Sequence, residues 1–277
     1  LPVIPAEKNG KRVACIGAGP ASLTVANDLL PLGYEVVILE QWDKPGGLMR
    51  TNIPAFRLPE TVIDEEIGYI ASMGAEIRYG TRVDSLKQLL ATGGYDAVFV
   101  GSGAPKGKEL ELPGRKEGDA NIHIGIQWLE SVAFKHLDKI GERVLIIGVG
   151  NTAMDCCRSS LRLGAKDVKV MARKPRQFFK ASEWELEDAE SENVEIVVNH
   201  APKSFVVENG KLQGMLFDKM QYEIDARGRI IAERVSPRFR SGDFAGGIHD
   251  GVDASLKAIE GESLPEPTRA APRGNLT

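Results

Sequence analysis

Two stretches of the 277-residue sequence can be laid over each other: RVACIGAGPAS at residues 12–22 and RVLIIGVGNTA at residues 143–153. Each opens with a charged residue and a continuous apolar run, which is typical of a strand buried on both faces of a parallel sheet. Each continues as Gly-x-Gly-x-x-small into a helical pattern that closes on a Leu-Gly pair, at Gly33 and Gly164. A second β-type run follows at residues 35–39 and 168–171. The sequence therefore predicts the same β-α-β unit twice.

The remaining segments predict an α/β protein with two Rossmann-like dinucleotide-binding domains, one inserted in the other. Helices are expected at residues 60–73 and 183–192, and the charge run of the second is interpreted as a solvated face. Strands are expected at residues 75–79, 97–100, 194–198, 203–207 and 212–217, with a hairpin turn at residues 208–210. Residues 263–277, rich in Pro, Arg and Gly, are predicted to be disordered.

The first copy has the features that make a glycine-rich turn a specific signal: a strand before it, a helix after it, and an acid at the end of the second strand. Gly17 allows the tight turn, and Gly19 lets the backbone approach a pyrophosphate. The helix from about Pro20 then points unpaired N–H groups at the phosphates. Glu40 ends the second strand, where a carboxylate can accept hydrogen bonds from an adenosine ribose. Ser22 stands where a third glycine is usual, and it is small enough to keep helix and strand close.

The second copy differs at the position that binds the ribose. Gly148 and Gly150 suit the same turn, and Asn151 with Thr152 can cap the helix. No acid ends the second strand, because Arg173 and Lys174 follow it. Two cations suit a 2′-phosphate better than a bare hydroxyl, which favours NADPH over NADH, although NADH stays possible. The alternative interpretation is an exposed basic turn without a ligand.

Composition excludes several other classes of function. A net charge of −4 argues against a general nucleic-acid binder, and no apolar run approaches the roughly 20 residues that span a bilayer. Residues 1–5 do not read as a secretion signal, so we expect a soluble, cytoplasmic protein. Cys15, Cys156 and Cys157 cannot hold an iron–sulfur cluster alone and are interpreted as buried apolar residues. The four histidines lack a metal-like spacing.

Two dinucleotide sites in one chain suggest that two redox rings meet. Hydride transfer between bound cofactors needs little acid–base chemistry from the protein, so we expect no catalytic side chain and no metal ligand. A flavin-free dehydrogenase is an alternative that leaves the second copy unexplained. A non-catalytic scaffold subunit that keeps bound nucleotides is another.

Further motifs resemble a known family. Residues 45–49 read PGGLM, residues 53–59 read IPAFRLP, residues 148–155 read GVGNTAMD, and KASE follows at residues 180–183. Together these resemble the small (beta) subunit of NADPH-dependent glutamate synthase, the flavin domains of dihydropyrimidine dehydrogenase, and the small subunits of NAD(P)H:ferredoxin oxidoreductases. The resemblance runs from about residue 8 to residue 235.

The resemblance implies a set of cofactor contacts at matching positions. The FAD contacts would be Gly17, Ala18, Gly19, Pro20, Ala21, Ser22, Glu40, Gly47, Leu48, Arg57, Val83, Gly101, Gly242 and Asp243. The nicotinamide contacts would be Gly148, Val149, Gly150, Asn151, Thr152, Arg173, Lys174 and Lys180, with the last three near the 2′-phosphate.

The resemblance also implies a domain division and a function. Residues 8–113 with 232–262 would form a discontinuous FAD-binding domain of glutathione-reductase-like fold, and residues 114–231 the inserted NAD(P)-binding domain. The chain would be an FAD-dependent NAD(P)H oxidoreductase that passes electrons to an iron–sulfur subunit or ferredoxin-type acceptor in a hetero-oligomer. Two departures stand out: the family's cysteine-rich N-terminal region is absent, and the segment between Val235 and Ser241 is short.

Overall fold

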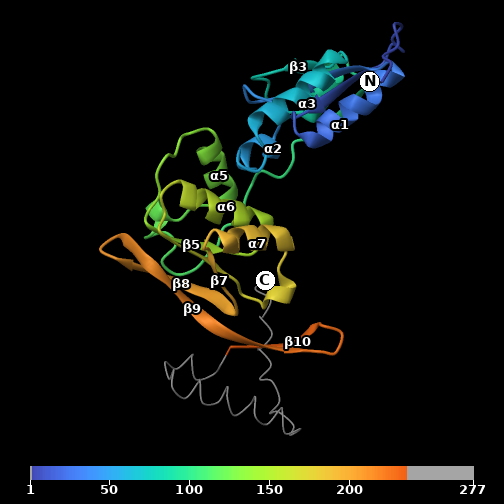
Figure 1. Cartoon of the computed structure of the whole chain (residues 1–277). Coiled ribbons are helices and arrows are strands. Elements are labelled where there is room, and N and C mark those ends of the chain that lie inside the picture. The colour runs from blue at the N-terminus through green and yellow to red at the C-terminus, as the bar shows by residue number, and fades with distance from the viewer. Residues whose placement is uncertain (1, 236–277) are drawn as a thin grey trace, which may run out of the picture. The chain divides into compact units, whose positions relative to one another are not determined.

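The computed structural model describes residues 2–235 (Figure 1). The predicted FAD contacts at Gly242 and Asp243, and the predicted disordered tail at 263–277, lie outside these residues. The described chain divides into two compact units. Unit 1 comprises residues 2–109, 123–143 and 155–166, and unit 2 comprises residues 110–122, 144–154 and 167–235.

Unit 1 contains a four-stranded parallel sheet in the order β3-β2-β1-β4. Its strands are β1 (Arg12–Ile16), β2 (Glu35–Leu39), β3 (Glu76–Arg78) and β4 (Ala97–Val100). Its main helices are α1 (Pro20–Leu29), α3 (Glu60–Ser72), α4 (Leu86–Thr92) and α5 (Gly125–Ala133), with a short α2 (Leu48–Thr51) and a 3-10 turn η1 (Leu30–Leu32). The order β3-β2-β1-β4 places the first strand of the glycine motif inside the sheet, as a dinucleotide-binding unit requires.

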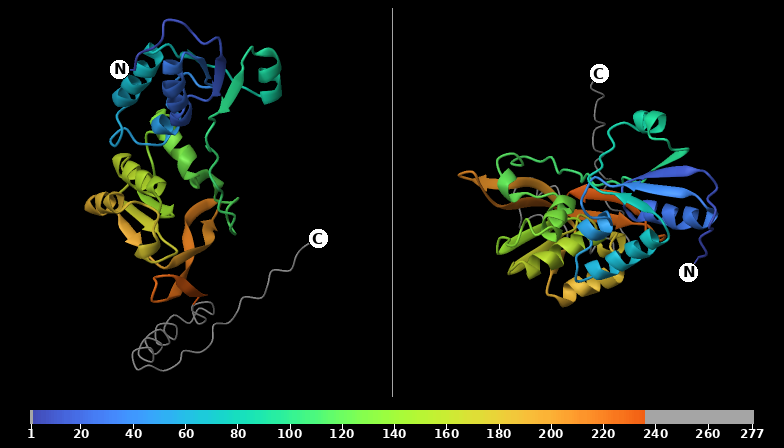
Figure 2. Two further views of the ribbon diagram at one scale, coloured as in Figure 1. Left: turned by 90° about the vertical axis from the view of Figure 1, so that its right-hand side faces the viewer. Right: turned by 90° about the horizontal axis from the view of Figure 1, so that it is seen from above.

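Alternation along the strands separates the two faces of this sheet. Val13 and Cys15 of β1, with Ile38 of β2, pack into a core that includes residues of α1 and α3. Ala14 and Val37 point the other way, into a smaller cluster that includes Leu89 of α4. Figure 2 shows the same arrangement, with α1 and α3 on one side of the strands and α4 on the other. Both faces are covered, which explains the continuous apolar runs in the sequence.

Unit 2 contains two three-stranded sheets. The first has the order β5-β6-β7 and contains β5 (Arg143–Ile147), β6 (Asp167–Met171) and β7 (Glu195–Val197). Its connections contain α6 (Asn151–Arg162), the 3-10 turn η3 (Arg176–Phe178) and α7 (Glu183–Ser191), and residues 155–162 of α6 belong to unit 1. The second is antiparallel, in the order β10-β9-β8, with β8 (His200–Glu208), β9 (Lys211–Ile224) and β10 (Ile230–Val235). A further 3-10 turn, η2, spans Asp119–Asn121. The predicted repetition of the β-α-β unit and the α/β fold class are both confirmed.

The antiparallel sheet extends beyond its predicted bounds. The predicted hairpin turn is confirmed, because Asn209 and Gly210 both have positive φ, 51° and 72°, as a tight two-residue turn requires. Strand β10 was not predicted, although Asp225 in the turn between β9 and β10 is a residue type typical of turns. The Asp225 carboxylate accepts hydrogen bonds from the N–H groups of Arg227 (3.0 Å) and Arg229 (2.8 Å).

The predicted solvated face of the acidic helix is correct only in part. Glu183 and Glu190 of α7 both pair with Arg176, at 2.7 and 2.5 Å, on the surface. Glu185, however, is fully buried. Helical periodicity explains the difference, since Glu185 shares the inward face with Leu186 and Ala189. None of the helices in the described part of the chain is both long and apolar enough to cross a membrane.

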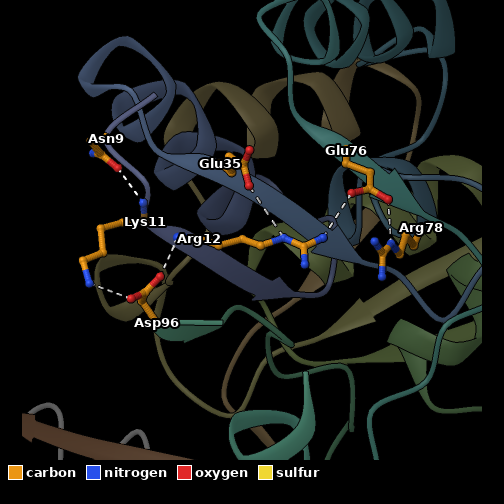
Figure 3. A network of polar contacts seen from close by, with 7 residues as sticks. All are labelled: Asn9, Lys11, Arg12, Glu35, Glu76, Arg78 and Asp96. Atoms are coloured by element: carbon orange, nitrogen blue, oxygen red, sulfur yellow. Dashed lines mark hydrogen bonds and ion pairs between the residues drawn. The ribbon is translucent and has the colours of Figure 1, made fainter. Parts of the chain in front are cut away.

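Charged side chains connect the amino ends of the strands of unit 1 (Figure 3). Asp96, just before β4, accepts the backbone N–H of Arg12 at 2.8 Å and the Lys11 ammonium at 2.8 Å. The Arg12 guanidinium lies 3.9 Å from Glu35 of β2 and 3.8 Å from Glu76 of β3. This network lies at the opposite end of the strands from the glycine turn. The hydrogen bond from Lys11, followed by that from the N–H of Arg12, lowers the pKa of Asp96.

The Asp96 network predicts a pH-dependent contribution to stability. Because folding lowers the pKa of Asp96, its stabilising effect is complete above the ordinary carboxyl pKa of about 4 and is lost as the pH falls through the folded value. Asp96→Asn should therefore lower the Tm of the protein by a few degrees at pH 7, and the gap to the wild type should narrow as the pH falls below about 4. Asp84→Asn is the matched control and should have little effect, since among the described residues Asp84 pairs only with the exposed Arg82, at 2.8 Å. A gap that stays constant over this pH range would contradict the assignment.

Candidate dinucleotide-binding sites

The first glycine turn lies at the carboxyl ends of β1 and β2. The N–H of Gly17 donates to Leu39 O at 2.8 Å, and α1 begins at Pro20 with Gly19 as its N-cap. Gly17 has φ +86°, and a Cβ there would lie 2.9 Å from Gly101 O. Both the backbone conformation and the space therefore demand glycine at position 17. At the start of α1, the N–H groups of Ala21 and Ser22 come before the first intrahelical bond, from the N–H of Leu23 to Gly19 O at 3.1 Å, and can face an anion.

A second loop closes on this turn. The N–H of Gly46 donates to Ala18 O at 2.8 Å. Gly47 has φ +51°, and a Cβ there would lie 2.9 Å from Gly19 Cα. Helix α2 then begins at Leu48, whose side chain is largely exposed. The predicted contacts Gly17 to Ala21 and Gly47 are thus brought together as one backbone cradle.

The missing third glycine of the motif is compensated elsewhere in the fold. Ser22 is fully buried on α1, and a Cβ on Gly101 would lie only 2.1 Å from Ser22 Oγ. Gly101 follows β4, and its N–H donates to Ile16 O at 2.9 Å. The helix therefore approaches the sheet closely because the glycine is on the strand side. Gly101 has a packing role that sequence analysis missed, while its predicted contact with FAD stays a prediction.

Glu40 is buried at the end of β2 and holds the turn in place. One carboxylate oxygen accepts the N–H of Ala18 at 2.7 Å, and the other accepts the N–H of Trp42 at 2.9 Å. A carboxylate offers about four acceptor positions, so about two remain for donors such as ribose hydroxyls. Glu40 can thus shape the phosphate-binding turn and bind a ribose. The acceptor role towards Ala18 could not be seen in the sequence spacing.

The structure places the other predicted FAD contacts of unit 1 at different positions around the cradle. The N–H of Thr81 donates to Glu40 O at 2.8 Å, which brings the segment before Val83 beside the acid. Val83 itself packs against the cluster around Val37 and Leu39. Arg57 forms an ion pair with Asp155 on α6 at 2.6 Å. Its predicted contact with FAD stays a prediction.

The second glycine turn repeats the first at the end of β5. The N–H of Gly148 donates to Met171 O at 3.1 Å, which matches the bond from Gly17 to Leu39. Gly148 has φ +120°, but no atom lies within 4 Å of a Cβ at Gly148 or Gly150. Backbone conformation alone therefore requires glycine at position 148. The corresponding approach of a phosphate to Gly150 is sterically open.

A downstream segment holds this second turn from the side. The N–H groups of Lys180 and Ala181 donate to Val149 O at 3.1 and 3.0 Å. The N–H of Ser182 donates to Asn151 Oδ1 at 3.0 Å. Asn151 is the first residue of α6, with Thr152 next to it, and their predicted capping role stays a prediction. These bonds bring the backbone of Lys180 to the glycine turn from a distance of about thirty residues in sequence, while the predicted contact of Lys180 with a 2′-phosphate stays a prediction.

The predicted basic turn directly follows β6. Arg173 and Lys180 have exposed side chains, and Lys174 is half-buried with its ammonium 5.7 Å from the ring centre of Phe178. The Tyr222 hydroxyl donates to Arg173 O at 2.5 Å and so fixes the backbone of the turn to β9. Arg176, three residues further on, is instead neutralised by Glu183 and Glu190. The structure thus brings cations to the end of β6, where a ribose 2′-phosphate would lie.

The cysteines lie in the core, as predicted. Cys15, Cys156 and Cys157 are buried free thiols. Burial raises the pKa of Cys15 to about 11 and the pKa of Cys156 to about 12. Thiols with such pKa values are poor nucleophiles. The three cysteines of the sequence therefore do not form a redox dithiol.

Comparison with known proteins identifies the class that this fold and these turns define. The family model described as pyridine nucleotide-disulphide oxidoreductase matches residues 11–238, and the chain belongs to this family. In structure, the chain is similar to Mycobacterium tuberculosis FprA in complex with NADPH, with a TM-score of 0.70 and 17% identity over 82% of this chain and 67% of that one. It is also similar to the thioredoxin reductase of T. acidophilum, with a TM-score of 0.57 and 21% identity over 80% of this chain and 73% of that one. These likenesses confirm the predicted fold.

Curated relatives confirm the resemblance seen in the motifs. The chain is 37% identical to an NADP(+)-dependent formate dehydrogenase subunit beta from Moorella thermoacetica, over 80% of this chain and 32% of the relative. It is 33% identical to a putative glutamate synthase [NADPH] small chain from Cereibacter sphaeroides, over 84% and 58%. It is 37% identical to the NAD-dependent dihydropyrimidine dehydrogenase subunit PreT from Salmonella typhimurium, over 72% and 48%. The chain thus spans between about a third and three fifths of these relatives.

Substitution at the first turn tests the packing argument. Gly17→Ala would combine positive φ with a contact of 2.9 Å to a backbone oxygen, whereas Gly10→Ala, at φ +75°, meets no atom within 4 Å. We expect Gly10→Ala to cost about 1 kcal/mol of unfolding free energy, and Gly17→Ala to cost about 1–3 kcal/mol more, because overpacking adds to backbone strain. Chemical denaturation followed by circular dichroism measures both. Equal losses would show that the space around Gly17 can relax.

Proposed function

We propose that the chain is the NAD(P)H-oxidising flavoprotein part of an electron-input enzyme. FAD would bind at the first glycine turn and NADPH at the second. Hydride would pass from the nicotinamide to the flavin, and electrons would leave to an iron–sulfur centre on a partner subunit or a ferredoxin-type acceptor. The observation that carries this proposal is the pair of complete glycine turns, one with a buried acid and one with a basic turn.

The residues around the first turn fit a flavin dinucleotide. Gly19 and the start of α1 offer backbone N–H groups at a helix terminus, where a partial charge of about +0.5 favours a pyrophosphate. Glu40 keeps acceptor capacity for ribose hydroxyls after binding Ala18 and Trp42. The loop at Gly46 and Gly47 closes on the turn, and this loop belongs to the motif shared with the flavin-containing family.

The residues around the second turn fit a nicotinamide dinucleotide with a 2′-phosphate. Gly150 leaves space for the pyrophosphate, and Val149 O and Asn151 Oδ1 are already engaged by the segment 180–182, so the turn is held before ligand arrives. Arg173 and Lys174 replace the acid that would select a bare 2′-hydroxyl. Guanidinium groups suit phosphate because they present paired donors.

The protein's contribution to the reaction would be binding, orientation and exclusion of water. When bound, the two cofactors supply the hydride chemistry themselves, so no side chain of the chain is assigned a proton-transfer role. Rigid placement of two reacting groups can lower a barrier by several kcal/mol. We propose that residues 8–113 with 232–262 bind FAD and residues 114–231 bind NADPH.

The cellular setting of the chain is also a proposal. The relatives described above are named as a subunit of formate dehydrogenase, a small chain of glutamate synthase and a subunit of dihydropyrimidine dehydrogenase, which supports a hetero-oligomer with a separate electron acceptor. A cytoplasmic location is consistent with these relatives and with the absence of a spanning helix among the described residues.

A visible spectrum of the purified protein, repeated without oxygen after addition of NADPH, tests the proposal. A flavin band that bleaches within seconds is the expected result. A flavin that NADPH does not reduce would favour a nucleotide-binding scaffold. A colourless protein that cannot be reconstituted with FAD would favour a flavin-free dehydrogenase.

Coenzyme preference tests the role of the basic turn. Replacing Arg173 and Lys174 together by Ala should raise the KM for NADPH by about 10–100-fold, because two charge-assisted bonds to the 2′-phosphate are lost, and leave the KM for NADH nearly unchanged. Arg176→Ala is the matched control, since this cation lies in the same segment but pairs with α7. Equal losses for both coenzymes would refute the assignment, and steady-state reductase kinetics decide between the outcomes.

A further inference from the structure

Phe56 and Arg57, in the loop after α2, both contact side chains of helix α6. Arg57 Nη1 donates to Asp155 Oδ1 at 2.6 Å, and both side chains are well shielded, at 19% and 7% exposed. Phe56, next to it, lies against two arginines of the same helix. The guanidinium of Arg162 is 3.9 Å from the ring centre and that of Arg158 is 5.0 Å away. We name these five residues the α6 clamp.

The spacing of the helix residues makes the clamp directional. Asp155, Arg158 and Arg162 follow one another at i, i+3 and i+7, so they lie on one face of α6 over about two turns. A cation over an aromatic face prefers a defined geometry, and an ion pair at 2.6 Å is equally specific. The clamp therefore resists both sliding and rotation of α6 against the loop.

In unit 1, the loop after α2 and helix α6 both also contact helix α5. Asn52 Nδ2, just before the loop, donates to Ile126 O of α5 at 2.8 Å. Cys156 Sγ of α6 lies 3.8 Å from Gly125 O, also of α5. The loop itself is fixed by the N–H of Arg57, which donates to Pro54 O at 2.8 Å. Loop, α5 and the Asp155–Arg162 part of α6 thus form one packed group.

Burial makes the charge of Asp155 depend on its partner. Desolvation raises the pKa of Asp155, while the hydrogen bond from Arg57 opposes this change. A buried ion pair contributes little net stability, because desolvation offsets the attraction, but removal of one partner leaves an uncompensated charge. The pair is therefore suited to specifying one arrangement of loop and helix.

We propose that Arg57 and Asp155 are positioning residues for coenzyme binding and flavin reduction, acting through helix α6. The helix begins at Asn151 in the second glycine turn, and the loop follows the Pro45–Gly47 segment that closes on the first turn. The clamp thereby holds the Asp155–Arg162 part of the helix whose first residues belong to the second glycine turn. This inference rests on the proposed function.

The test uses the whole chain and four variants. Asp155→Asn and Arg57→Lys each weaken the pair, and the exchange of Arg57→Asp with Asp155→Arg restores opposite charges. Asp64→Asn is the matched control, because it breaks the ion pair of Asp64 with the buried Arg50 of α2 in the same unit without touching α6. The readouts are the affinity for NADP+ by calorimetry, the single-turnover rate of flavin reduction by NADPH, FAD content and Tm.

We expect Asp155→Asn to keep its FAD, to bind NADP+ about tenfold more weakly, and to reduce its flavin about tenfold more slowly. Small misplacements of reacting groups have effects of this size or larger. Arg57→Lys should be intermediate, and the charge exchange should recover part of the loss. Asp64→Asn should change only the Tm. If the pair is purely structural, the variants at Arg57 and Asp155 and the control Asp64→Asn will all lower the Tm and leave the affinity for NADP+ unchanged. That result would overturn the inference.

The outcomes also separate this inference from the proposed function. If NADPH does not bleach the wild-type flavin, hydride transfer is refuted and the clamp is judged on NADP+ affinity alone. If the wild type binds no NADP+, both proposals are overturned. A charge exchange that recovers none of the loss seen in Asp155→Asn would overturn the clamp and leave the proposed function intact.

Discussion

Around the first glycine turn, Gly17, Gly47 and Gly101 have no room for a side chain because other atoms lie too close. Unit 1 is organised around these three contacts. A Cβ at Gly17 would meet Gly101 O at 2.9 Å, one at Gly47 would meet Gly19 Cα at 2.9 Å, and one at Gly101 would meet Ser22 Oγ at 2.1 Å. These residues come from four places in the sequence: the end of β1, the start of α1, the loop before α2, and the end of β4. Backbone meets backbone at Gly17 and Gly47, and backbone meets the Ser22 hydroxyl at Gly101. N–H groups rather than side chains therefore form the surface offered to a phosphate at the turn.

The second turn has the same sequence pattern but a different means of support. Among residues 2–235, no atom lies within 4 Å of a Cβ at Gly148 or Gly150, so the described residues do not pack against this turn as they do against the first. It depends instead on three hydrogen bonds from the segment 180–182 to Val149 and Asn151. The tight turn suits a cofactor that stays bound, and the open turn suits a coenzyme that must enter and leave. This contrast agrees with the proposed order of FAD at the first turn and NADPH at the second.

The parts of the fold set by local pattern could be predicted from the sequence, and the parts set by distant contacts could not. Apolar runs followed by Gly-x-Gly indicated β1, β5 and the helices after them, and Asn209-Gly210 indicated the hairpin. The compensation between Ser22 and Gly101 spans 79 positions, and the bond between Arg57 and Asp155 spans 98. Neither has a local signal, because each depends on how segments pack. The role of Glu40 as an acceptor for Ala18 could not be predicted for the same reason, although the sequence did place Glu40 at the end of β2.

The central claim is that one chain holds two separate dinucleotide sites, and a competition experiment tests it most directly. Protein stripped of flavin is titrated with FAD, then with NADP+ in the presence of saturating FAD, and each titration is followed by calorimetry. The account predicts one equivalent of each ligand per chain, with neither displacing the other. Release of FAD by NADP+, or a total of one nucleotide per chain, would show a single site and contradict the account.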